Sequence, residues 1–200
     1  MSDLSPPDPS EHDWLALATA PIPLVEALSW VSDPGCGAVV LFSGVVRDHA
    51  DGRPGVSVLE YEAYEEQVVP HLARIAAEAR RRWPSLARLV AIHRAGALAV
   101  GEVAVVVVVS TEHREAAFEA GRFVIDTIKA EVPIWKLETW EGGRAWSEAC
   151  SPVGAAPEPG AAGASLRHVD ASGSGPEGNG RAPTPAAASP HAAGGAGSTP

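Results

Sequence analysis

The chain has 200 residues and a formal net charge of −10, so we expect no general affinity for nucleic acid. Its longest apolar run, Val103–Val109, is far too short to cross a bilayer, and no basic segment followed by an apolar one opens the chain. We therefore expect a cytoplasmic protein with no membrane partner.

The composition divides the chain into three segments. Residues 1–20 begin with a polar, proline-rich stretch and predict a flexible N-terminal segment. Residues 151–200 consist almost entirely of Ala, Gly, Pro and Ser. They cannot bury enough apolar surface to offset the entropy lost on ordering, which predicts a disordered tail. Residues 21–150 remain as one domain, which is long enough to form a hydrophobic core.

The first half of this domain predicts the order helix, strand, strand, helix. A helix with a proline near its start is expected over residues 23–32. A β-rich run after an Asp-Pro-Gly turn predicts a strand over 37–46, and rough alternation predicts another over 56–64. Helical spacing follows, until Pro84 ends it, in Val68, Leu72, Ile75, Ala79 and Trp83.

The second half predicts the order strand, strand, helix, strand. Strands are expected over 86–93 and 102–110, and the continuous apolar run of the second indicates burial on both faces. Thr111 is placed to cap a helix that Pro133 ends. A final strand over 134–140 precedes a Gly-Gly turn. Together these elements predict an α+β fold, a sandwich of helices on a mostly antiparallel sheet.

The lysine content is the most informative feature of the composition. Lys129 and Lys136 are the only lysines among 15 basic residues, and they are seven residues apart. Because the rest of the chain uses arginine, these two positions are candidates for sites that require an amine. A helix–proline–strand reversal can bring both amines to one site. The alternative is that Lys129 merely complements the dipole at the end of its helix.

Three further groups could bind an anion. His113 and Arg114 lie at the first turn of a predicted helix, where free N–H groups and the helix dipole favour negative charge. Arg47 begins a polar loop after a buried strand, and Arg144 lies in a Gly-Gly-Arg turn. In each case an ordinary solvated surface position remains the alternative.

The sequence offers no sign of a metal site or a bound cofactor. Cys36 and Cys150 lack the spacing of metal ligands, and no nucleotide-binding fingerprint is present. A reduced, cytoplasmic setting is the plain interpretation of the two cysteines. His71 is assigned to a helix surface and His93 to packing within a strand.

Six segments, in order along the chain, resemble the large, catalytic subunit of molybdopterin synthase. The pattern H-R-x-x-A-F-E-A followed by K-x-x-x-P-I-W-K-x-E is highly specific. The segments are GAVVLFSGVVRDH (37–49), LEYEAY (59–64), ARRRWP (79–84), IHRAGALAVGE (92–102), STEHREAAFEAGRFVIDTIKAEVPIWKLE (110–138) and GRAW (143–146).

The resemblance implies an α/β-hammerhead fold and a homodimer within a heterotetramer. A small ubiquitin-like sulfur-carrier subunit would dock at each end, and its C-terminal Gly-Gly, activated as a thiocarboxylate, would thread into the active site. The substrate would be the pterin cyclic pyranopterin monophosphate, and the product would be molybdopterin. The chain would then be a sulfurtransferase of molybdenum cofactor biosynthesis.

The resemblance also implies roles for individual residues. Lys129 would be the catalytic lysine, Lys136 would assist it, and both would contact the substrate. The backbone at Val45–Val46 and Leu137–Glu138 would line the pocket. The remaining substrate contacts would be Arg47, His113, Arg114 and, from the neighbouring subunit, Arg144.

Two other classes of function stay open. The same fold could be a non-catalytic scaffold that binds a ubiquitin-like sulfur carrier, or an unrelated anion-binding regulator. The segment 151–200 departs from the family pattern. It does not look like a fused carrier, because it predicts no strands and does not end in Gly-Gly, so we expect the carrier to be a separate chain.

Overall fold

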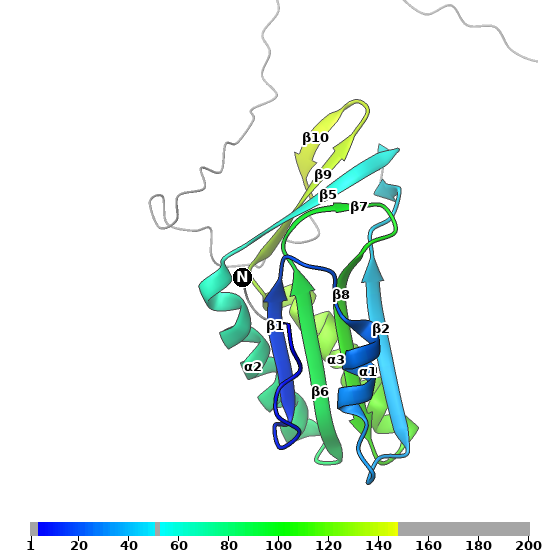
Figure 1. Cartoon of the computed structure of the whole chain (residues 1–200). Coiled ribbons are helices and arrows are strands. Elements are labelled where there is room, and N and C mark those ends of the chain that lie inside the picture. Colours follow the sequence, from blue (N-terminus) through cyan, green and yellow to red (C-terminus); the bar gives the residue numbers. More distant parts are fainter. Residues whose placement is uncertain (1–3, 51–52, 148–200) are drawn as a thin grey trace, which may run out of the picture. The chain divides into compact units, whose positions relative to one another are not determined.

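The computed structural model describes residues 4–50 and 53–147, and the tail predicted over 151–200 lies outside them. The described residues form two four-stranded sheets, a two-stranded ribbon and three helices (Figure 1). This confirms the predicted α+β class, although the strands are divided between sheets. Within the described residues, no helix is long and apolar enough to cross a membrane.

The first sheet has the order β1-β6-β8-β2 and is mostly antiparallel. Only β1 runs parallel to its neighbour β6. The central strand β8 is buried from Ala104 to Thr111, which confirms that its apolar run is covered on both faces. The strands are β1 (Asp13–Ala18), β2 (Ala38–Val45), β6 (Leu86–Arg94) and β8 (Val103–Thr111).

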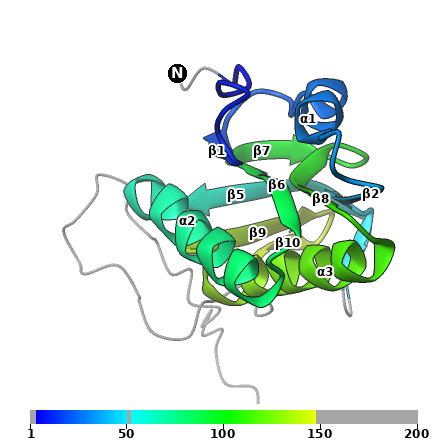
Figure 2. The same ribbon diagram turned by 90° about the horizontal axis from the view of Figure 1, so that it is seen from below.

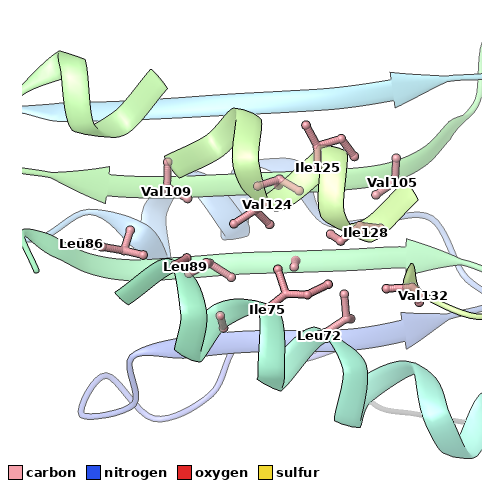
Figure 3. Packing of buried hydrophobic residues seen from close by; sticks show 14 of the residues in the cluster. Leu72, Ile75, Leu86, Leu89, Val105, Val109, Val124, Ile125, Ile128 and Val132 are labelled. Atoms are coloured by element: carbon pink, nitrogen blue, oxygen red, sulfur yellow. The ribbon is translucent and has the colours of Figure 1, made fainter. Parts of the chain in front are cut away.

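Helices cover both faces of the first sheet. Helix α1 (Leu24–Val31) lies on one face, while α2 (Glu65–Arg82) and α3 (Arg114–Glu131) lie side by side on the other (Figure 2). The main core fills the space between the sheet and the pair α2 and α3, where Leu72 and Ile75 of α2 meet Val124 and Ile128 of α3 (Figure 3). This packing fixes the position of the last turn of α3.

The second sheet crosses one end of the first and has the order β10-β9-β5-β7 (Figure 1). All its pairings are antiparallel. Its strands are β5 (Val56–Ala63), β7 (Gly96–Ala99), β9 (Ile134–Trp140) and β10 (Gly143–Trp146), and the short ribbon consists of β3 (His49–Ala50) and β4 (Arg53–Pro54).

The eight predicted elements are all present, but β1, β3, β4, β7 and β10 were not predicted. The expectation that residues 1–20 are flexible is wrong for β1, where Trp14 and Ala18 are buried. Arg80 of α2 holds this strand by donating to the carbonyl of His12 and the carboxylate of Asp13. Such long-range contacts leave no local pattern. The other four strands have two to four residues, too few to reveal a period.

The predicted cap of α3 is also wrong. His113 occupies the capping position, and no side chain caps the helix by a hydrogen bond. The Thr111 hydroxyl instead donates to the His113 carbonyl at 2.7 Å. Thr111 therefore shapes the entry to the helix without serving the free N–H groups of its first turn.

Candidate functional site

A cavity of about 510 Å³ lies where the end of the first sheet, the last turn of α3 and the second sheet meet. We call it the main cavity. Apolar residues at one end of the core form part of its wall, and Figure 3 labels four of them, Val105, Ile125, Ile128 and Val132. Polar side chains complete the lining, and they include Ser43, Arg47, Lys129 and Lys136.

Lys129 reaches the main cavity from the last turn of α3. It lies four residues after Ile125, so both side chains emerge on the same helix face. The Lys129 Nζ stands 5.6 Å from the centroid of the Phe42 ring, within range of a cation–π interaction. Phe42 comes from β2, so the amine is positioned by a strand as well as by its own helix.

Lys136 reaches the same cavity from β9. Strand alternation places Lys136 and Glu138 on one face of the second sheet, with Tyr61 opposite Lys136 on β5. The Lys136 Nζ lies 3.0 Å from Glu138 Oε1, and Glu138 is only 2% exposed. Glu138 therefore holds the amine of Lys136 at the cavity wall. Both lysines therefore line one cavity, as expected for the reversal at Pro133.

Val45, at the end of β2, and Arg47, just beyond it, also line the main cavity. A β-bulge falls between Gly44 and Val45, and Val45 is half exposed. Both Val45 and Arg47 also line an adjoining hollow of about 70 Å³ together with Lys136 and Glu138. Arg47 is thus brought close to the Lys136–Glu138 ion pair.

Two predicted lining residues face elsewhere. Val46 is buried, its N–H donates to the Glu102 carbonyl, and its own carbonyl accepts from the N–H of Gly101. Leu137 is paired with Glu60 and projects from the face of the second sheet opposite to Lys136. The expectation was that their backbone lines the pocket, but neither residue lines the main cavity, by backbone or by side chain.

His113 and Arg114 lie at the other end of α3. They line a separate hollow of about 520 Å³ with Gly37, Glu112 and Glu115, here called the α3 hollow. Arg114 is exposed, and its Nη2 is 3.8 Å from Glu115. Fifteen residues of helix separate Arg114 from Lys129, or about 22 Å along the axis. One copy of the chain therefore does not bring these residues to the main cavity.

Arg144 is also remote from the main cavity. It pairs with Thr139 on β9, which places it on the opposite face of the second sheet from Lys136. There it forms an ion pair with Glu60. Burial raises the pKa of the neighbouring Glu62 carboxyl, and repulsion by Glu60 adds to this rise, which Arg144 partly offsets.

His93 lines the main cavity, a role that the sequence did not suggest. It is 8% exposed, and its ring meets Tyr61 edge to face with centroids 5.2 Å apart. Its Nδ1 lies 2.8 Å from the carbonyl oxygen of Arg94. Burial lowers the pKa of His93 to about 4, although the hydrogen bond to Arg94 acts in the other direction. Its position on the α3 face of β6 was predictable, but the cavity beside it was not.

Comparisons with known proteins match most of the described region. A family model described as MoaE protein matches residues 17–131. The molybdopterin synthase catalytic subunit of Nostoc sp. is 44% identical over 135 residues, which are 68% of this chain and 81% of that protein. The subunit of the same name from Bacillus subtilis is 42% identical over 130 residues, or 65% and 82%.

Other relatives are much longer than the matched region. The molybdopterin synthase catalytic subunit of Drosophila willistoni is 39% identical over 130 residues, and the match covers 65% of this chain but 35% of that protein. Among solved structures, molybdopterin synthase from Staphylococcus aureus has a TM-score of 0.63 and 36% identity, covering 66% of this chain and 96% of that one. The MoaE protein of Burkholderia ambifaria has a TM-score of 0.60 and 34% identity, with coverages of 70% and 91%.

Proposed function

This chain belongs to the MoaE protein family, and from this premise we propose that it is the catalytic subunit of a molybdopterin synthase. It converts cyclic pyranopterin monophosphate to molybdopterin in molybdenum cofactor biosynthesis. The sulfur comes from the thiocarboxylated C-terminus of a small ubiquitin-like carrier, which is a separate chain. The observation that carries the proposal is that Lys129 and Lys136 line one cavity together with Arg47.

The charge of the main cavity suits two anionic reactants. Three cations, Arg47, Lys129 and Lys136, line this cavity, and the carboxylate of Glu138 lines the adjoining hollow, in a chain whose net charge is −10. The substrate carries a phosphate and the carrier ends in a thiocarboxylate, so each brings negative charge into the same space. Opposite charges 4 Å apart attract by about 4 kcal/mol where solvent is partly excluded, enough to offset much of the repulsion between the reactants.

The two lysines have different roles toward the thiocarboxylate. Lys129 acts at its carbonyl, where a positive charge stabilises the oxygen as the sulfur leaves, and where an amine can also move a proton or accept the acyl group. Lys136, held by Glu138, positions the anionic partners. Each carrier delivers one sulfur and leaves as a carboxylate after water adds at its acyl carbon. Two carriers are therefore consumed in succession.

The proposed site is shared between two copies of the chain. His113 and Arg114 lie about 22 Å along α3 from Lys129, and Arg144 lies on the far face of the second sheet. A homodimer lets these residues of one copy serve the cavity of the other. With one carrier at each cavity, the assembly is a heterotetramer.

Mixed dimers test the shared site. Lys129→Ala and Arg114→Ala each inactivate both sites of a homodimer, but a dimer with one copy of each variant keeps one intact site. Co-expressing the two variants should restore roughly a quarter of wild-type activity, because half of the dimers are mixed and each has one working site. No recovery, with mixed dimers present by mass spectrometry, would contradict sharing.

The direct test of the function is conversion of the precursor in a single turnover. Cyclic pyranopterin monophosphate is mixed with the protein and a thiocarboxylated molybdopterin synthase small subunit, and dithiolene formation is followed. A small subunit lacking its last two glycines is the matched control, and it should dock but transfer no sulfur. Docking of both forms without any conversion would identify a non-catalytic scaffold, and turnover with the truncated form would contradict threading.

A further inference from the structure

His93 presents an unused hydrogen-bond acceptor to the main cavity. Its Nδ1 is engaged with the Arg94 carbonyl, while its Nε2 has no hydrogen-bond partner among the described residues. Among the described residues, the buried side-chain nitrogens that lack a hydrogen-bond partner are Nε of Arg80 and Nε of Arg94. Nε2 of His93 is not one of them, so this unpartnered atom is accessible, and its ring lines the main cavity. We propose that His93 Nε2 accepts a hydrogen bond from an N–H group of the bound pterin and so selects its orientation, an inference that rests on the proposed function.

The hydrogen bond at Nδ1 fixes which ring nitrogen carries the proton. A carbonyl oxygen can only accept, so Nδ1 must donate to Arg94 O across the 2.8 Å between them. In a neutral ring the proton is then on Nδ1, and Nε2 is left with a lone pair. The edge-to-face contact with Tyr61 restricts rotation of the ring and preserves this arrangement.

The neighbours of His93 make this lone pair useful for recognition. Arg47, Lys129 and Lys136 line the same cavity and can only donate hydrogen bonds or supply positive charge. These groups suit the phosphate of the substrate. A pterin ring also carries N–H donors, for which they offer nothing. A neutral acceptor can bind these N–H donors without changing the charge of a cavity that three cations line.

Burial keeps His93 in this state. Because its pKa is lowered to about 4, the ring stays neutral at physiological pH even though it faces a cavity. A protonated ring would donate from both nitrogens and repel the cations around it. His93 is thus a binding residue whose acceptor role is constant over the pH range in which the protein works.

Two substitutions separate the two ring nitrogens. In His93→Asn the side-chain amide can still donate to Arg94 O from the position of Nδ1, but no acceptor remains at Nε2. In His93→Gln the amide oxygen can take the place of Nε2, while the donor to Arg94 O is lost. Calorimetric titration of each purified variant with cyclic pyranopterin monophosphate, without carrier, should give about tenfold weaker binding for Asn and nearly normal binding for Gln. A purely structural role predicts the reverse order.

The outcomes distinguish this inference from the proposed function. If the wild-type protein does not bind the precursor, the proposed function fails. If it binds and His93→Asn binds equally well, the function stands and the role of His93 is refuted. Nitrogen-15 NMR of wild-type protein with labelled histidine covers the case in which a variant does not fold. The Nε2 signal of His93 should be that of an unprotonated nitrogen and should shift with the precursor, whereas a protonated or unresponsive Nε2 would refute the inference.

Discussion

The Nζ of Lys129 lies 5.6 Å from the centroid of the Phe42 ring, so the last turn of α3 and strand β2 fix one amine from two sides. The ring supports a compact cation at this distance. A guanidinium is wider and planar, and it would have to rearrange against Phe42 and the strand beneath it. We therefore expect this position to accommodate an amine better than a guanidinium.

Lys129→Arg and Lys129→Ala should both lose at least about a hundredfold in the rate of sulfur transfer, or roughly 2.7 kcal/mol of transition-state stabilisation. Arginine keeps the charge but cannot release a proton or approach a crowded acyl carbon. Single-turnover conversion with excess thiocarboxylated carrier measures the loss. Arg122→Ala, an exposed change on the same helix, is the control and should be near wild type. Near-normal turnover by Lys129→Arg would reduce Lys129 to an electrostatic contact.

Lys136→Met should destabilise the fold by roughly 1.5–3 kcal/mol, because it removes a charged hydrogen bond to Glu138, which is 2% exposed. Lys136→Arg keeps the charge and should be milder in both stability and activity. The double variant Lys136→Met with Glu138→Gln removes both charges of the pair and should lose less stability than the single one. Urea unfolding at neutral pH measures all three. Equal losses in the single and double variants would show that the ion pair is not the cause.

Acidification should destabilise the protein, because His93 is protonated more readily in the unfolded chain than in the folded one. In the unfolded chain His93 has its ordinary pKa of 6.5, and in the folded protein burial lowers this pKa to about 4. Between these values the unfolded state binds a proton that the folded state does not, so stability is lost as pH falls from 6.5 towards 4 and is unaffected above 7. The full effect is about 3 kcal/mol.

Carboxylates titrate in the same range, so the His93 contribution must be isolated by difference. Arg47, Lys129 and Lys136 line the same cavity as His93, and Glu138 lines the adjoining hollow. Unfolding free energies at pH 7 and pH 4.5 should therefore differ less in His93→Gln than in the wild type. An equal difference in the two proteins would remove His93 as a source of the pH dependence.

Gly44 and Gly121 should respond to alanine with opposite signs. A Cβ at Gly44 would lie 2.6 Å from Cγ1 of Val105, so Gly44→Ala should cost about 1–3 kcal/mol and intrude on the main cavity. At Gly121, within α3, the nearest atom would be 3.4 Å away, and alanine should stabilise the helix by up to about 1 kcal/mol. Denaturation midpoints measure both. A stabilised Gly44→Ala would mean that β2 shifts easily at its bulge.

The elements with a long periodic pattern were predictable from the sequence. The apolar run of β8 and the helical spacing of α2 and α3 depend on local order, and each is where the pattern indicated. Strand β1 was missed because its position depends on Arg80 and on pairing with β6, both far away in the chain. The division of the strands into two sheets depends likewise on distant pairings.

The candidate site was predictable where chemistry selected a rare residue. Lys129 and Lys136 were noticeable in an arginine-rich chain, and they do share a cavity. Arg114 is separated from that cavity because it and Lys129 lie at opposite ends of α3. His93 was assigned to packing within its strand, and only the tertiary structure reveals the space beside it.

The alternation of side chains along β9 makes the length of this strand critical. Lys136 lines the main cavity and Glu138 the adjoining hollow, while Trp135 and Leu137 face the other side of the second sheet. Inserting or deleting one residue before Lys136 would exchange the two sets, turning apolar side chains into the cavity and a buried carboxylate out of it. Changes of chain length should therefore be tolerated in the turn at Glu141 and Gly142, where the strand has ended, but not between Pro133 and Glu138.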